Sequence, residues 1–278
     1  MTAIRRIQPL PLPDDLSPGP IGDRPKIVRM NPADLSVDAA YQRDLSRKSI
    51  SLIHKLISDW DWKRFKPPVV AKVGDAWHVI DGQHTAIAAA SHGGIGEIDV
   101  MIVDADGGED RARAFIGHNR DRVQITNTQM FFAAAAAGDD DALTTKQVCE
   151  RAGATILRNP SPGRPFQPGE VIAVSALVKL VKARSAMKAR VVVETLVKAR
   201  VAPISADLIR AVDLILHGDD YAGELVADDV ASTIMRMGPA IDAKASEIAL
   251  AKKMQRWRAT AIVLFQNTRK RRGSQRAA

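Results

Sequence analysis

The pattern of apolar residues changes once along the chain, near residue 104, and this change limits the folds that the chain can adopt. Between residues 26 and 104, short apolar runs of strand length alternate with two helical stretches and end at glycine, proline or aspartate turns. Beyond residue 104 the strand signals stop, and one helical pattern follows another. The sequence therefore predicts an α+β protein in which a small mixed α/β domain precedes an all-helical domain.

The domain boundaries follow from the same change and from the two ends of the chain. We expect the α/β domain at residues 26–125 and the helical domain at 126–268. Residues 1–25 contain six prolines, a spacing that prevents helix and favours a disordered, extended arm. Residues 269–278 form a basic tail.

Within the first domain the elements can be placed individually. Ser46 is a suitable cap for a helix, and Gly74-Asp75 is a two-residue turn that would join two strands into a hairpin. The expected elements are a strand at 26–30, a helix at 46–60, strands at 67–73 and 76–80, a helix at 84–91 and a strand at 97–103.

The string Asp81-Gly82-Gln83-His84-Thr85 lies where a predicted strand becomes a predicted helix. The first amides of a helix have no partner within the helix and attract anions, and glycine lets the backbone approach a ligand. Gln83 and Thr85 can donate to phosphate oxygens, and His84 can donate or transfer a proton near neutral pH. The alternative is that Asp81-Gly82 is only a turn and His84 only begins the helix.

The formal charge of +8 and the pI of about 9.7 favour a polyanionic partner such as DNA. No acidic residue follows Glu247, and residues 179–200 contain seven basic residues and one acidic residue. An ordinary solvated helix surface is the alternative for that run. The predicted DNA contacts are Lys179, Lys182, Arg184, Lys188, Arg190, Arg269, Lys270, Arg271 and Arg272.

Other features of the helical half have two interpretations. Residues 240–268 read as one helix whose apolar stripe would pack within its own domain or against a second subunit of a homodimer. The string TTKQVCERAG resembles the first helix and turn of a helix-turn-helix, but Pro160 prevents a long second helix. Cys149 is the single cysteine, which excludes an internal disulfide, and its place in the helical pattern predicts a small buried side chain.

The sequence predicts no membrane-spanning segment, because nowhere do eighteen apolar residues run together. The first residues also lack an apolar stretch long enough for a signal peptide. A cytoplasmic protein is expected.

The order of motifs resembles the ParB/sulfiredoxin superfamily, specifically its ParB N-terminal-like domain. Tyr41-Gln42-Arg43 matches the first motif of that domain, and Gly82-Gln83-His84-Thr85 stands in place of its Gly-Glu-Arg-Arg-type box at a helix start. His118-Asn119-Arg120 falls where its Glu-Asn-x-Gln-Arg motif would be. The Asp-Gly-Gln-His form is similar to variants in phage, mobile-element and DNA-modification proteins.

The resemblance implies a fold in which these loops meet over a nucleotide, CTP or ATP, together with Mg²⁺. Phosphate would be held by residues 82–85, with Gln42, Arg43, Asn119 and Arg120 completing the pocket. Asp81 would be the first carboxylate to consider as a magnesium ligand. The leading hypothesis is thus a DNA-associated, nucleotide-binding protein.

Two other functions remain open. One is a ParB-like nuclease or small-molecule phosphotransferase, in which His84 or Asp81 would be catalytic through proton transfer or metal binding. The other is an interaction module without catalysis. The sequence departs from the box of the family because His84 and Thr85 stand where arginines would grip a triphosphate.

Overall fold

A computed structural model describes residues 6–38, 45–105, 107–120, 124–158, 163–221 and 223–271. The chain divides into two compact units, Met1–Val123 and Gln124–Ala278. The first contains a mixed α/β fold and the second is helical, so the α+β fold class predicted from the sequence is confirmed.

The first unit is built on a five-stranded mixed sheet with the strand order β1-β5-β3-β4-β2. Strands β3 and β4 form the expected antiparallel hairpin through Gly74, whose φ of +60° suits this turn. Parallel pairs join β3 to β5 and β4 to β2, while β1 pairs antiparallel with β5. The strands are β1 (Lys26–Met30), β2 (Leu35–Val37), β3 (Val69–Val73), β4 (Ala76–Asp81) and β5 (Ile98–Ile102).

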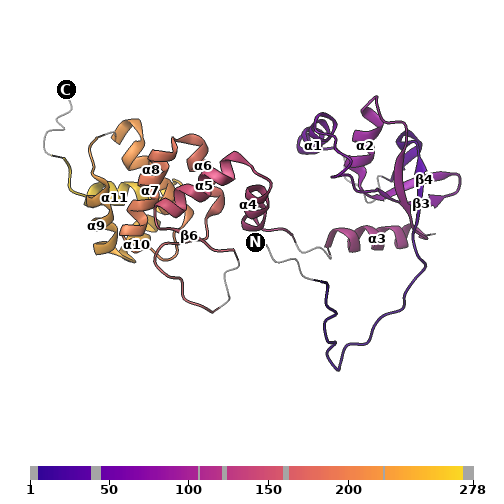
Figure 1. The fold of residues 1–278 in the computed structure, drawn as a ribbon, viewed down its shortest axis with the longest axis horizontal. Coiled ribbons are helices and arrows are strands. Elements are labelled where there is room, and N and C mark those ends of the chain that lie inside the picture. Colours follow the sequence, from indigo (N-terminus) through magenta and orange to yellow (C-terminus); the bar gives the residue numbers. More distant parts are fainter. Residues whose placement is uncertain are drawn as a thin grey trace. The chain divides into compact units, whose positions relative to one another are not determined.

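Helices of the first unit cover both faces of this sheet (Figure 1). Because side chains alternate along a strand, Val70 and Val79 pack towards α2 (Gln83–Ser91) on one face. Val69 and Ile80 point to the other face, where they pack near Phe115 of α3 (Gly108–Arg120). Helix α1 (Arg47–Ser58) packs against α2 and begins, as expected, at Ser46, whose hydroxyl accepts from the Ser49 amide at 3.1 Å.

The second unit is a bundle of helices around one large apolar core. Cys149 is 2% exposed in this core, as predicted. Helix α11 packs against both α8 and α10, which places its apolar side inside the unit. The helices are α4 (Asn127–Ala136), α5 (Asp140–Arg151), α6 (Val174–Ala183), α7 (Ala186–Lys198), α8 (Ala206–His217), α9 (Ala227–Met237), α10 (Ala240–Ala251) and α11 (Arg256–Asn267).

Some predicted elements were wrong or missing. The single helix expected at 240–268 is two helices, α10 and α11, and no glycine or proline marks the break at 252–255. Strand signals do not stop at residue 104, since β6 (Thr155–Ile156) pairs with β7 (Glu170–Val171) in the second unit. Strands of two or three residues, β2 included, are too short to show a period and are fixed by their distant partners.

Two other regions bear on the sequence expectations. Residues 6–25 are exposed and form neither helix nor strand. The segment after Gly153 is extended as β6 rather than helical, so α5 is not followed by a second helix at the point where a helix-turn-helix would have one. No helix in the described part of the chain is long and apolar enough to cross a membrane.

Candidate phosphate-binding site

The junction between β4 and α2 depends on a glycine. Gly82 is the N-cap of α2 and has a left-handed backbone with φ +89°. A β-carbon on Gly82 would lie 3.0 Å from the Cα of Pro68, which is closer than real β-carbons normally approach. Both the backbone angle and the neighbour therefore require glycine here, and the strand passes into the helix without an intervening loop.

The first turn of α2 presents backbone amides without acceptors. Gly82 has no side chain that could cap the helix, and the first backbone hydrogen bond runs from the Ala86 amide to the Gly82 carbonyl at 3.0 Å. Among the described residues, none accepts from the amides of Gln83, His84 or Thr85. The first turn also contains no acidic residue, and the nearest carboxylate in sequence is that of Asp81, just before the N-cap.

A cavity of about 560 Å³ lies at this junction. This volume is in the usual range for small-molecule sites, which is about 300–1,000 Å³. Helices α1 and α3 contribute the apolar part of its wall, and the five residues of the junction contribute most of the polar part. The lining residues are Leu52, Leu56, Asp81, Gly82, Gln83, His84, Thr85, Phe115 and Asn119.

The structure brings most of the sequence-predicted pocket residues together at this cavity. Asn119 reaches the wall from α3, where its side-chain amide donates to the Phe115 carbonyl at 2.8 Å. Arg120 is exposed at the end of α3 and does not line the cavity. Gln42 and Arg43 lie outside the described residues.

Sequence reasoning missed three apolar residues of the wall, Leu52, Leu56 and Phe115. Leu52 and Leu56 lie one turn apart on α1, and no motif in the sequence marked them as residues of the cavity wall. A second hollow of about 240 Å³ shares Leu52, Leu56 and Thr85 with the first. Charged residues of both signs line it, and no motif marked them: Lys55, Asp59, Asp61, Arg64 and Lys66.

The residues present fit a magnesium ion only when it is bound together with phosphate. Asp81 is the one carboxylate on the wall among the described lining residues. The described part of the chain contains no group of three His, Cys, Asp or Glu side chains that could hold a metal. Mg²⁺ is commonly held by one or two carboxylates together with the phosphate oxygens of its substrate, and Asp81 could supply such a carboxylate.

The basic residues predicted to contact DNA have different surroundings. Arg184 makes two hydrogen bonds to Asp213, at 2.9 and 3.4 Å, and both side chains are mostly buried. Lys182 pairs with Asp141 at 2.7 Å, and this hydrogen bond raises the pKa of the lysine. Arg190 pairs with Glu194 at 2.6 Å. These three cations therefore have acidic partners within the unit.

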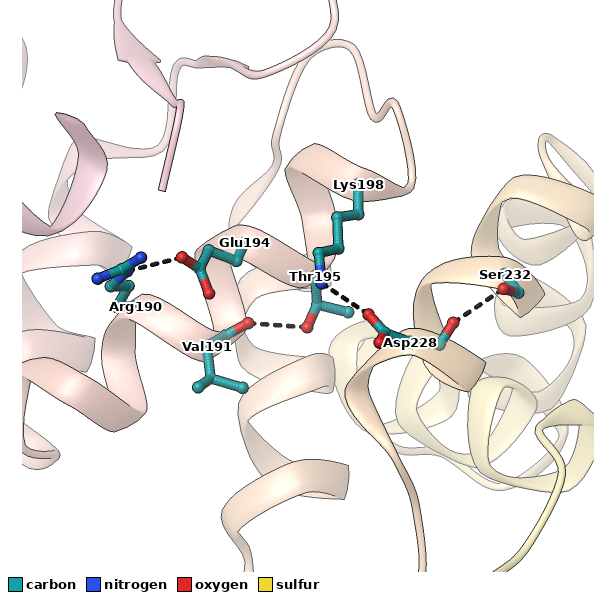
Figure 2. A network of polar contacts seen from close by, with 7 residues as sticks. All are labelled: Arg190, Val191, Glu194, Thr195, Lys198, Asp228 and Ser232. Atoms are coloured by element: carbon teal, nitrogen blue, oxygen red, sulfur yellow. Dashed lines mark hydrogen bonds and ion pairs between the residues drawn. The ribbon is translucent and has the colours of Figure 1, made fainter. Parts of the chain in front are cut away.

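The same is true further along α7, as Figure 2 shows. Lys198 pairs with Asp228 at 2.7 Å, and the hydrogen bond raises the pKa of Lys198. The Asp228 carbonyl in turn accepts from the Ser232 hydroxyl. Lys179 and Lys188 are exposed and form no ion pair with any described residue.

At the C-terminal end, Arg269 and Arg271 are exposed. Lys270 lies over the Phe265 ring and donates to the Phe265 carbonyl, and burial lowers the pKa of its ammonium group. Arg272 lies outside the described residues.

Comparisons with known proteins give distant likenesses. No protein-family model matches the sequence, and no curated protein matches it. Among solved structures, the chain is similar to the C-terminally truncated chromosome-partitioning protein ParB from Caulobacter crescentus complexed with CTP-gamma-S. The two sequences are 14% identical and the TM-score is 0.33. The match covers 82% of this chain and 98% of that one. The same Caulobacter protein complexed to the centromeric parS site matches at 14% identity and a TM-score of 0.29, over 86% and 99% of the two chains. A Pnob8-like ParB-N domain matches at 14% identity and a TM-score of 0.28, over 82% and 86%.

Proposed function

We propose that this chain is a DNA-associated protein that binds a nucleotide through its phosphates at the N-terminus of α2. The observation that supports this most directly is that Gln83, His84 and Thr85, whose amides have no acceptor among the described residues, line a cavity of about 560 Å³. Unpaired amides at a helix N-terminus are a favourable environment for phosphate. The order of the sequence motifs, which is similar to that of ParB N-terminal-like domains, supports the same ligand class.

The side chains of the junction have distinct roles in this proposal. The side chains of Gln83, His84 and Thr85 would donate to phosphate oxygens beside the amides, and Gly82 lets the backbone approach closely. Asn119 would contribute from α3. Gln42 and Arg43 are expected to complete the pocket, as the sequence resemblance implies. A magnesium ion carried by the phosphates would take Asp81 as its carboxylate ligand.

The test is isothermal titration calorimetry of the full chain with CTP, ATP and ADP, each with and without Mg²⁺. We expect heat from at least one triphosphate, and a weaker response when Thr85→Val or His84→Ala removes a donor. Ser91→Ala is the matched control, because Ser91 lies at the opposite end of the same helix and its hydroxyl donates only to the Ile87 carbonyl. Absence of binding to all three nucleotides would overturn the proposal of a nucleotide-binding site.

A catalytic form of the same site is favoured by one observation, namely that the His84 imidazole and the Asp81 carboxylate line the same cavity. A ParB-like nuclease or a small-molecule phosphotransferase would use these groups for proton transfer or metal binding. Plasmid nicking or phosphate transfer that disappears in His84→Ala but persists in Ser91→Ala would establish it. A chain that binds nucleotide but neither nicks plasmid DNA nor transfers phosphate would contradict it.

DNA association rests on charge. Lys179 and Lys188 are exposed without an acidic partner among the described residues, so their charge is available to phosphates, as is that of Arg269 and Arg271. Lys182, Arg184 and Arg190 would have to exchange an internal partner for a phosphate. Electrophoretic mobility shift with a duplex of unrelated sequence tests this association directly.

A further inference from the structure

Four helices of the second unit end in the same hydrogen-bonded motif but with different residues. In α4 and α5, Gly138 and Gly153 follow the C-cap with φ of +82° and +74°. In each case the next amide reaches back to a carbonyl five residues earlier, as in Asp139 to Ala134 at 3.0 Å. This is the common glycine-terminated helix end.

Helices α7 and α10 make the same motif without glycine. Arg200 follows α7 with φ +55°, and Lys253 follows α10 with φ +49°. The amides of Val201 and Met254 reach back to Leu196 at 3.2 Å and to Ala249 at 3.1 Å. Within the described part of the chain these are the two residues other than glycine with positive φ, and both are basic and exposed.

A basic residue at this position is not explained by stability alone. The left-handed conformation strains any residue that has a β-carbon, and glycine would relieve that strain. The favourable interaction of a cation with the helix C-terminus offsets only part of it. A lysine where the fold favours glycine is therefore a reason to look for a contact that its side chain makes.

The surroundings of Lys253 are basic. The turn between α10 and α11 carries Lys252 and Lys253, and the first turn of α11 carries Arg256 and Arg258. All four are exposed, and no acidic residue occurs anywhere after Glu247. Arg256 pairs with Asp242 at 2.7 Å. The other three form no ion pair with any described residue, and the Arg258 guanidinium lies 5.1 Å from the centre of the Trp257 ring.

Arg200 has different neighbours. Two residues before it, Lys198 is already paired with Asp228, and Glu194 lies on the preceding turn of α7 (Figure 2). Arg200 thus shares the backbone geometry and the charge of Lys253 but not its acid-free basic surroundings.

We propose that the α10–α11 turn together with the first turn of α11, with Lys252, Lys253 and Arg258 as contacts, is a docking surface for the phosphate backbone of double-stranded DNA. This inference rests on the DNA association proposed above and names a surface for it. Three neighbouring cations that form no ion pair within the described part of the chain match the dense negative charge of a duplex, and contacts of this kind bind without reading base sequence.

An anionic membrane is the competing partner, because Leu250 beside the turn is 83% exposed. Binding at a membrane surface needs a continuous apolar helix face. The residues one turn before Leu250 are Ser246 and Glu247, both polar and exposed, so the leucine stands alone on that side of α10. The charge pattern therefore favours DNA.

The experiment is fluorescence anisotropy of a labelled 20-base-pair duplex of unrelated sequence with the full chain, titrated at several salt concentrations. Lys253→Gly should reduce the slope of log K against log salt by about 1, the value for one phosphate contact, while its Tm is unchanged or higher. The triple variant Lys252→Gln, Lys253→Gly, Arg258→Gln should reduce the slope by about 3. Arg200→Gly is the matched control. It also removes one positive charge and the strain of a positive φ, but at the end of α7 instead of α10.

Each result has a definite meaning. If the unmodified chain binds no DNA, the DNA association itself fails, and this surface with it. If the chain binds DNA and Lys253→Gly leaves the slope unchanged, only the surface is wrong. An equal loss in Arg200→Gly would reveal a general charge effect and overturn the assignment. Anionic vesicles that bind the chain through Lys253 when the duplex does not would overturn it in favour of a membrane.

Discussion

Gly82 and Pro68 approach each other so closely that a β-carbon on Gly82 would lie 3.0 Å from the Pro68 Cα. The contact joins the residue that starts α2 to the residue before β3, and so fixes the helix start against the sheet. The geometry of the candidate phosphate site is therefore set by backbone packing as well as by the polar side chains on its wall.

Gly82→Ala is expected to lower the free energy of unfolding more than a glycine-to-alanine substitution in an open turn does. The positive φ costs about 1–2 kcal/mol for a residue with a β-carbon, and crowding against Pro68 adds about 1–3 kcal/mol. Gly74→Ala is the matched control, since Gly74 has φ +60° and nothing within 4 Å of its added β-carbon. In urea unfolding, Gly82→Ala should lose more free energy of unfolding than Gly74→Ala. Equal losses would show that the structure around Pro68 adjusts to the added β-carbon without a loss of stability.

Gln83→Glu is expected to separate stability from ligand binding. The first turn of α2 has no acidic residue, and a carboxylate there should stabilise the helix by about 0.3–1 kcal/mol. The same charge would compete with phosphate for the free amides, so affinity for a nucleotide should fall. Thermal unfolding and calorimetry on the same preparation measure both effects.

If Gln83→Glu binds nucleotide as tightly as the unmodified chain, the proposal that phosphate binds at the first turn of α2 is contradicted. A glutamate at the C-terminal end of the helix, Ser91→Glu, serves as the comparison. It is expected to lower stability slightly, because its charge is unfavourable at that end, and to leave nucleotide affinity nearly unchanged.

Arg184→Gln should lower the free energy of unfolding by about 1–3 kcal/mol, because it breaks two charge-assisted hydrogen bonds to a carboxylate that is mostly buried. Arg190→Gln should change it by less than about 0.5 kcal/mol, since the Arg190–Glu194 pair is an exposed pair one helical turn apart. Denaturant titrations of the two variants give the comparison. Similar small effects would mean that the Asp213 carboxylate finds another partner or water.

The local signals in the sequence predicted much of the fold. Strand β1 has the predicted bounds, and α1 begins at the predicted cap, Ser46. The hairpin turn at Gly74 is also confirmed. The helix start and the turn depend on residues that are adjacent in sequence, because a capping side chain or a turn glycine acts on its immediate neighbours.

What the sequence did not predict depends on distant residues or on a rare backbone state. Strand β2 exists because it pairs with β4, and Phe115 lines the cavity because α3 packs on that side of the sheet. The end of α10 was missed because Lys253 takes the conformation for which glycine is the usual signal. A pattern search has no means of recognising a lysine in that role.

The buried thiol of Cys149 provides a pH-dependent prediction. Burial raises its pKa from 9.0 to about 12. Between these values the unfolded chain loses a proton that the folded chain retains, so the free energy of unfolding falls as pH rises. The contribution of the thiol is complete below pH 9 and is lost progressively towards pH 12. At pH 10 the loss should be about 1.4 kcal/mol, one pH unit above the unfolded pKa.

Urea unfolding of the unmodified chain and of Cys149→Ala, at pH 8 and pH 10, isolates this effect from the titration of lysines. Cys149→Ala is expected to be less stable at both pH values, because it leaves a small cavity beside Val148 and the core around it. Its deficit should be smaller at pH 10 by about 1.4 kcal/mol, since alanine has no proton to lose. A deficit that is the same at both pH values would mean that the thiol ionises equally easily in the folded and unfolded chain, and would contradict its burial.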